Sequence, residues 1–186
     1  DWFKNYTDIV LVKDLEDICN IQNVRDFQSL ISLLVARVGN LLNVSEIARD
    51  GRMSATTVSR YIGLLEALYL VNSQKNWSNN LTTRVIKSPK IYFNDTGLLT
   101  SLLDMSVEKI FMSNYWGAVL ENFIFMELEK QLSWSLIDAK LLHFRTTSGV
   151  EVDIIAEKRD GTIVGMEIKA ASSVSPNDLK GLRYLQ

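Results

Sequence analysis

Residues 151–170 read EVDIIAEKRDGTIVGMEIKA, and this stretch decides how the second half of the chain folds. Side chains along a β-strand point alternately to two faces. Glu151 and Asp153 therefore share a face with Ile155, and the E-x-K motif at 167–169 places both of its charged residues on one face. The RDG between the two runs is a turn signal. The stretch predicts a β-hairpin with one apolar face that is buried and one face that gathers the charges.

The loop length at residues 159–161 fixes the register of this hairpin. A three-residue loop with its glycine in the left-handed conformation is a common hairpin connection. It pairs Asp153 with Glu167 and Glu151 with Lys169. A two-residue turn would shift the register by one residue and mix polar with apolar side chains on both faces. The three-residue loop is therefore the better interpretation.

The paired carboxylates of Asp153 and Glu167 repel each other unless a positive charge lies between them. Mg²⁺ takes oxygen ligands and usually keeps several waters, so it suits two carboxylates and a phosphate. Such an ion activates water and stabilises charge on a phosphodiester, and Lys169 would position that water or offset charge on the phosphate. The alternative is a solvated strand face on which Glu151 and Lys169 form a weak ion pair. The hairpin alone leaves both interpretations open.

The net charge of −2 conceals an uneven distribution along the chain. Residues 1–44 hold four basic and six acidic side chains, and residues 91–186 hold nine and thirteen. Residues 45–90 hold seven basic side chains against three acidic ones, a net charge of +4. A basic segment in an acidic chain predicts a surface that faces phosphate, and double-stranded DNA is the partner it indicates.

Several classes of protein are excluded by composition. The single Cys19 allows no internal disulfide, fits a reducing cytoplasm and is predicted to lie buried in a helix. The single His143 excludes zinc sites built from several histidines and is predicted to serve packing. No run approaches the ~18 apolar residues of a membrane span, so the sequence predicts a cytoplasmic protein without a membrane partner. The ends of the sequence indicate a fragment of a longer protein.

The first half of the sequence predicts helices. Apolar residues recur at spacings of three and four in residues 1–14 and 24–38. Residues 44–71 have the pattern of a helix-turn-helix, with Ser45 and Ser54 as the N-caps of its two helices.

Strands at residues 68–71 and 84–86 are predicted to form a wing over about residues 70–87. Small hydroxyls and an arginine at the start of a second helix are what a reader of the DNA major groove presents. The residues predicted to contact DNA are Thr56, Thr57, Ser59, Arg60, Arg52, Lys75 and Arg84. The alternative is a winged-helix module that makes protein contacts.

The second half predicts a helix, three strands and a final helix. The first of these helices, residues 114–132, is strongly apolar but contains Glu121, which is costly to bury unless it is paired or binds a cation. A short strand at residues 90–93 precedes it and is followed by Asp95, a predicted helix N-cap. The three strands and the last helix are expected at residues 140–145, 150–156, 162–170 and 175–186.

Four motifs occur in an order and at a spacing that resemble a known family. They are KSPKIYFNDTGL at residues 87–98, GAVLENF at 117–123, FR at 144–145 with GVEVD at 149–153, and EIK at 167–169. Together they resemble the C-terminal half of the prokaryotic AAA+-superfamily ATP-binding proteins that end in a domain of unknown function. In that family a P-loop ATPase domain precedes a winged helix, and the terminal domain is similar to a restriction endonuclease of the PD-(D/E)XK type.

The resemblance implies an α+β fold with two parts. A helical, winged-helix domain at residues 1–90 precedes a restriction-endonuclease-like core at 91–186, which lacks a further strand beyond Gln186. The nuclease pattern maps onto Glu121, Asp153 and Glu167 as metal ligands, and Lys169 completes the catalytic set. No G-x-x-x-x-G-K-[ST] occurs in the chain, so ATP binding is expected only in an N-terminal ATPase domain outside it.

Three functions follow from the resemblance. The first is a DNA-binding or regulatory module of an AAA+-type ATPase with an inactive nuclease-like fold. The second is an active Mg²⁺-dependent DNA endonuclease. The third is a protein-interaction module that couples ATPase subunits. The expected partners are double-stranded DNA and the ATPase domain of the same protein, and oligomerisation is left open.

Overall fold

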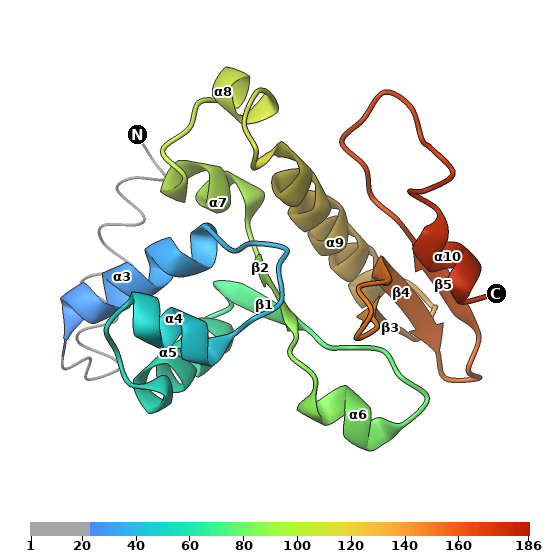
Figure 1. Ribbon diagram of the computed structural model, residues 1–186, viewed down its shortest axis with the longest axis horizontal. Coiled ribbons are helices and arrows are strands. Elements are labelled where there is room, and N and C mark those ends of the chain that lie inside the picture. The colour runs from blue at the N-terminus through green and yellow to red at the C-terminus, as the bar shows by residue number, and fades with distance from the viewer. Residues whose placement is uncertain (1–22) are drawn as a thin grey trace.

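The computed structural model describes residues 23–186 and shows helices packed around two small antiparallel sheets. A helical region lies at one end of the long axis and a three-stranded sheet at the other, with the long helix α9 (Trp116–Trp134) running between them (Figure 1). This arrangement confirms the predicted α+β class. The predicted helix at residues 1–14 and the predicted environment of Cys19 lie outside the described residues.

Three helices form the helical region: α3 (Val24–Val35), α4 (Val44–Asp50) and α5 (Ala55–Ala67). Their apolar stripes meet in one core, in which the rings of Phe27 and Tyr61 pack edge to face with centroids 5.3 Å apart. Ser54 caps α5 as predicted, because its side chain accepts a hydrogen bond from the Thr57 backbone N–H. The cap of α4 is Asn43 and not the predicted Ser45.

The predicted wing is wrong: its first strand, expected at residues 68–71, begins only at Val71, and its second strand, expected at residues 84–86, does not form. Strand β1 (Val71–Gln74) pairs antiparallel with β2 (Lys90–Phe93), and residues 84–86 belong to the helix α6 (Leu81–Ile86). The physical reason lies at Asn80, whose side chain accepts hydrogen bonds from the backbone N–H groups of Thr82 and Thr83 and so starts a helix. The residues of β2, which are buried throughout, pair with β1 instead.

The middle of the chain forms two short helices, α7 (Thr96–Leu102) and α8 (Val107–Phe111), before α9. Asp95 caps α7 as predicted, with its side chain accepting from the Leu98 N–H at 2.7 Å. Buried residues of α9, among them Phe125 and Met126, pack in the same core as strand residues of the three-stranded sheet.

The three-stranded sheet has the order β3 (Ala139–Arg145), β4 (Glu151–Lys158), β5 (Ile163–Met166). The predicted register of the β4–β5 hairpin is confirmed. Ile154 pairs with Met166, the Lys158 N–H donates to the Thr162 carbonyl at 2.9 Å, and Gly161 has a φ of +84°. A three-residue loop with a left-handed glycine produces this pairing.

The predicted division of β4 into two faces is wrong in one respect, because the strand contains a β-bulge. Leu142 of β3 pairs with Ile155, but Phe144 pairs with Val152, so three steps on β4 oppose two on β3. Asp153 therefore faces Lys90 and not the side of Ile155. Asp153 is also not solvated, since it is 4% exposed.

The end of the chain differs from the sequence expectation. Strand β5 stops at Met166 and not at residue 170, and the last helix, α10, is Lys180–Tyr184. Ser175 does not start this helix because its N–H and hydroxyl both bind the Asp178 carboxylate in a local turn. Leu182 of α10 packs over Gly165 on the sheet face that α9 leaves free. No helix within residues 23–186 is both long enough and apolar enough to cross a membrane.

Candidate functional site

The four predicted catalytic residues lie in one chain of ion pairs, and a fifth residue, Lys90, connects two of them. The order along the chain of ion pairs is Glu121, Lys90, Asp153, Lys169 and Glu167. The Lys90 Nζ lies 2.7 Å from Glu121 Oε1 and 3.3 Å from Asp153 Oδ1. These three residues come from β2, α9 and β4, and their side chains are at most 15% exposed. The costly Glu121 of the apolar helix is therefore paired, as its burial requires, and its partner is an ammonium group.

Further groups hold the Glu121 end of this chain. The Tyr92 hydroxyl donates to Glu121 Oε1 at 2.6 Å, and the Gln74 amide donates to the Asp153 backbone carbonyl at 3.2 Å. Burial opposes the charged form of Lys90, but two carboxylates face its single ammonium and keep its pKa above the ordinary value. Burial raises the pKa of Glu121, and the pull of Lys90 offsets only part of this effect.

The E-x-K motif holds the other end. Asp153 Oδ2 accepts a hydrogen bond from the Ile168 N–H at 2.9 Å and lies 4.0 Å from Lys169 Nζ. Lys169 Nζ also lies 2.6 Å from Glu167 Oε1. Glu151, which was predicted to pair with Lys169, instead lies 3.1 Å from Arg145. Burial raises the pKa of Glu167, and the hydrogen bond from Lys169 works in the opposite direction.

The carboxylates of Glu121, Asp153 and Glu167 do not surround a common point. Within the described part of the chain no group of three or more His, Cys, Asp and Glu residues is placed to hold a metal ion. The ammonium of Lys90 lies between Glu121 and Asp153, where a cation would otherwise neutralise them. Metal binding by the three carboxylates stays a prediction.

A cavity of about 170 Å³ adjoins the E-x-K motif and is lined by Glu151, Glu167, Lys169 and residues of the last helix. Glu167 Oε2 is buried and has no hydrogen-bond partner among residues 23–186. A carboxylate oxygen without a partner next to a cavity is a place where a small cationic or hydrogen-donating ligand fits.

Sequence reasoning missed two residues that organise this region, Lys90 and Asn122. Lys90 is the one charged residue of a four-residue strand, KIYF, that is buried throughout, and a buried lysine needs an anionic partner. Asn122 accepts from the Phe93 N–H at 2.7 Å and donates to the Phe93 carbonyl at 2.9 Å, so it ties α9 to β2. A charge in the apolar strand and an amide in the apolar helix were the available signals.

The residues predicted to contact DNA form two groups in the structure. Thr56, Ser59 and Arg60 are exposed at the start of α5, whereas the Thr57 hydroxyl lies 2.8 Å from the Ser54 hydroxyl of the cap. The exposed Arg52 lies in the turn before α5.

The second group adjoins a groove of about 330 Å³ between α5 and α6. Ser59, Lys75 and Arg84 line this groove together with Lys87. Arg84 is not free there, because its guanidinium nitrogens lie 2.5 and 2.6 Å from the carboxylate of Glu157. The Trp77 indole N–H donates to the same Glu157 carboxylate at 3.1 Å. The Trp77 ring packs edge to face with that of Phe144.

Comparison with known proteins gives a family and no function. Residues 1–109 match the model of a domain of unknown function, DUF8612, and residues 116–186 match that of a second, DUF4143. Uncharacterized proteins of Mycobacterium tuberculosis and Mycobacterium bovis are each 30% identical to the chain over 175 residues, 94% of its length. The chain spans 38% of the length of these relatives. No solved structure matches it. Because the DUF8612 model covers more than half of the chain, the protein belongs to the DUF8612 family.

Proposed function

We propose that the chain is a DNA-binding, regulatory module of an AAA+-type ATPase, with a nuclease-like part that does not cleave. The observation that carries the proposal is the division of α5 into two sides. Val58 and Tyr61 are buried in the helical core, whereas Thr56, Ser59 and Arg60 are exposed over its first two turns. A second helix with this division can place its amino-terminal residues in the major groove.

Charge supports the same surface. The groove beside α5 carries Lys75 and Lys87, and both come from the segment with a net charge of +4. Phosphate contacts fix a protein's position on DNA and base contacts supply specificity. Lysines at the groove suit the first task, and the hydroxyls of Thr56 and Ser59 suit the second.

The buried cation supports a module without cleavage. With Lys90 between Glu121 and Asp153, a metal ion would have to displace an ammonium group that is 4% exposed and paired with two carboxylates. The ATPase part of the proposal rests on the family resemblance of the four sequence motifs. The greater length of the two mycobacterial relatives leaves room in them for another domain.

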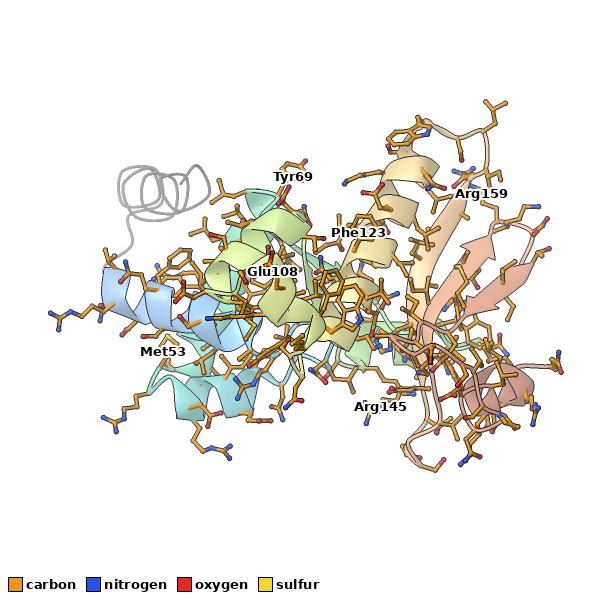
Figure 2. All side chains as sticks on the ribbon, turned by 90° about the horizontal axis from the view of Figure 1, so that it is seen from above. Met53, Tyr69, Glu108, Phe123, Arg145 and Arg159 are labelled. Carbon is orange, nitrogen blue, oxygen red and sulfur yellow. The ribbon has the colours of Figure 1, made fainter. Side chains whose placement is uncertain are left out.

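Fluorescence anisotropy with labelled duplex DNA tests the proposal. We expect binding that weakens with added salt, and we expect Arg60→Ala to reduce affinity and to lower the slope of log K against log[salt] by about 1. Arg159→Ala is the matched control, because Arg159 lies on the hairpin at the opposite end of the molecule from α5 (Figure 2). Equal effects of the two substitutions would contradict the assignment of α5, and the absence of any salt-dependent binding would contradict the function.

A second candidate is a Mg²⁺-dependent endonuclease, and one observation favours it. Glu167, whose Oε2 is buried without a hydrogen-bond partner among residues 23–186, lines a cavity together with Lys169. The test is nicking of supercoiled plasmid with Mg²⁺ or Mn²⁺. Activity that disappears in Asp153→Ala and in Lys169→Ala, with circular dichroism showing that both variants fold, would favour this candidate over the first. Activity that survives both substitutions would come from a contaminant.

A further inference from the structure

A cavity of about 210 Å³ lies where the helical region meets the three-stranded sheet, away from the ion-pair chain. It is lined by Asn76, His143, Lys87, Arg145 and two threonines, with Leu41 and Ser88. Asn76 follows β1, and His143 lies in β3, so the cavity joins the two parts of the molecule. Figure 2 shows Arg145 at this junction.

Two side chains of this cavity are buried without hydrogen-bond partners. Asn76 is 0% exposed and His143 is 1% exposed. Asn76 Oδ1, Asn76 Nδ2 and His143 Nδ1 make no hydrogen bond to any residue that the structure describes. The great majority of buried polar atoms in proteins are paired with protein or with ordered water, so three such atoms in one place require an explanation.

These unpartnered atoms lie together and have defined roles. Asn76 and His143 are partners in a parallel β-bridge, which sets their side chains next to each other on one side. His143 Nε2 lies 3.3 Å from the Ser88 carbonyl, an acceptor, so Nε2 carries the proton and Nδ1 is left as an acceptor. Burial lowers the pKa of His143 to about 4, which keeps the ring neutral at pH 7. The two side chains beside the cavity therefore hold the N–H donors of the Asn76 amide and two acceptors, Asn76 Oδ1 and His143 Nδ1, all buried in this structure.

The rim of the cavity is positive. Lys87 Nζ donates to the Arg145 backbone carbonyl at 2.8 Å, and the Arg145 guanidinium lies on the same rim. Glu151 neutralises part of the Arg145 charge at 3.1 Å, and the Lys87 ammonium has no carboxylate within ion-pair distance among residues 23–186. Guanidinium and ammonium groups are the usual ligands of phosphate.

We propose that this cavity binds a nucleotide whose base presents an amine beside a ring nitrogen, as adenine and cytosine do. The amine donates to Asn76 Oδ1 and to His143 Nδ1, and the ring nitrogen accepts from Asn76 Nδ2. An asparagine amide recognises adenine in this bidentate way in protein–DNA complexes. Lys87 and Arg145 bind the phosphate at the rim.

The size and the cover of the cavity agree with one small ligand. A volume of about 210 Å³ is below the ~300–1,000 Å³ of pockets for drug-sized ligands, so a base fits inside and the phosphate stays at the rim. The Asn76 and His143 atoms are covered in this structure, so entry of the base requires side chains at the rim to move outward. Lys87, whose Nζ binds the Arg145 backbone carbonyl at the rim, is one of the side chains that line the cavity. This site shares Lys87 with the groove beside α5, but Asn76, His143 and Arg145 take no part in the proposed DNA-binding function.

Isothermal titration calorimetry of the whole chain with AMP and with IMP tests the site. IMP has an oxygen where AMP has the amine, and its oxygen would face two acceptors. We expect AMP to bind at least ten times more tightly than IMP and to raise the melting temperature. Asn76→Leu, which is close in size and removes the amide, should abolish the preference, and Arg145→Met should weaken AMP and IMP equally. Arg159→Met is the control and should change neither.

Several results would overturn the proposal. Equal affinity for AMP and IMP would contradict the proposed contacts to the base. Binding of inorganic phosphate as tight as that of AMP would mean that the site binds an anion only. No binding at millimolar AMP, with Asn76→Leu more stable than the parent protein, would mean that the buried atoms are satisfied by water only. Arg145→Met leaves the buried atoms in place, so it still tests the phosphate contact if Asn76→Leu does not fold.

Discussion

Replacing Lys90 by Met removes the only cation that lies between Glu121 and Asp153 in the described structure. Methionine keeps the length and the apolar part of the side chain, so the substitution changes the charge with little change in packing. Both carboxylates stay buried, with side chains 15% and 6% exposed. The Tyr92 hydroxyl still donates to Glu121, but no positive group remains within ion-pair distance of that carboxylate in the described structure.

The loss of stability should be large. Removing one partner of a buried ion pair costs about 3–5 kcal/mol, because the remaining charge is buried without compensation. We expect the Lys90→Met substitution to lower the free energy of unfolding by that amount at pH 7, measured by urea denaturation followed through tryptophan fluorescence. A second substitution, Glu121→Gln, removes one uncompensated charge and should restore part of the loss.

The loss should also depend on pH, with a sign that follows from Glu121. Its pKa in the folded protein is already raised above the ordinary 4.5 by burial, and loss of Lys90 raises it further. A carboxyl group whose folded pKa exceeds its unfolded pKa destabilises the folded protein above that folded pKa, and the effect disappears as pH falls toward the unfolded value. The deficit of the Lys90→Met variant is therefore largest at pH 7 and above and becomes smaller toward pH 4.5.

An exposed pair of the same length provides the control. Lys130 Nζ lies 2.7 Å from Glu127, the same distance as in the Lys90–Glu121 pair, but these side chains are 50% and 39% exposed. Lys130→Met should cost at most ~1 kcal/mol. The reasoning is refuted if Lys90→Met costs no more than Lys130→Met, or if Glu121→Gln adds to the loss.

Three other substitutions give expected outcomes. Arg52 has a φ of +53°, so Arg52→Gly should raise the free energy of unfolding by about 0.5–1 kcal/mol in urea denaturation, and it should weaken duplex binding if the guanidinium contacts phosphate. Asn122→Leu leaves the buried N–H and carbonyl of Phe93 unpaired and should cost roughly 2–6 kcal/mol in the same assay. Burial lowers the pKa of His143 from 6.5 to about 4, so protonation favours the unfolded chain. Up to about 3 kcal/mol of the free energy of unfolding should therefore be lost as the pH falls from 6.5 to 4. His143→Gln should flatten that part of the profile of stability against pH.

The hairpin shows what local sequence can predict. Turn length and the left-handed glycine at residue 161 depend only on neighbouring residues, and the register that they predict is the one observed. The bulge in β4 was not predictable in this way. Its extra residue is accommodated where β3 also bridges to Asn76, a residue 67 positions before His143 in the chain. Pairing between distant segments leaves no periodic signal in either one.

The wing shows how local propensity misleads. Residues 84–86 have the composition of a strand, but the Asn80 cap starts a helix there, and the partner of β1 is the later strand β2. The predicted charged face of the hairpin failed for a similar reason. The sequence left a metal site and a solvated face open for Asp153, and its actual partner, Lys90, and the Glu121 that shares this lysine lie on elements far from it in sequence.

The ion-pair chain joins the two parts of the molecule, and this position explains why an ion pair stands there instead of apolar side chains. Lys90 begins β2, which pairs with β1 of the helical part, and its ammonium binds α9 and β4 of the sheet part. An apolar contact tolerates sliding, but a lysine held by two carboxylates specifies one position, because any shift exposes a buried charge to an unpaired environment. Asn122, bonded to both backbone groups of Phe93, fixes the other end of the same strand. If the helical part binds DNA as proposed, a displacement of it would reach the E-x-K motif through β2, Lys90 and Asp153. The Lys90→Met variant is the form of the protein in which that connection is cut.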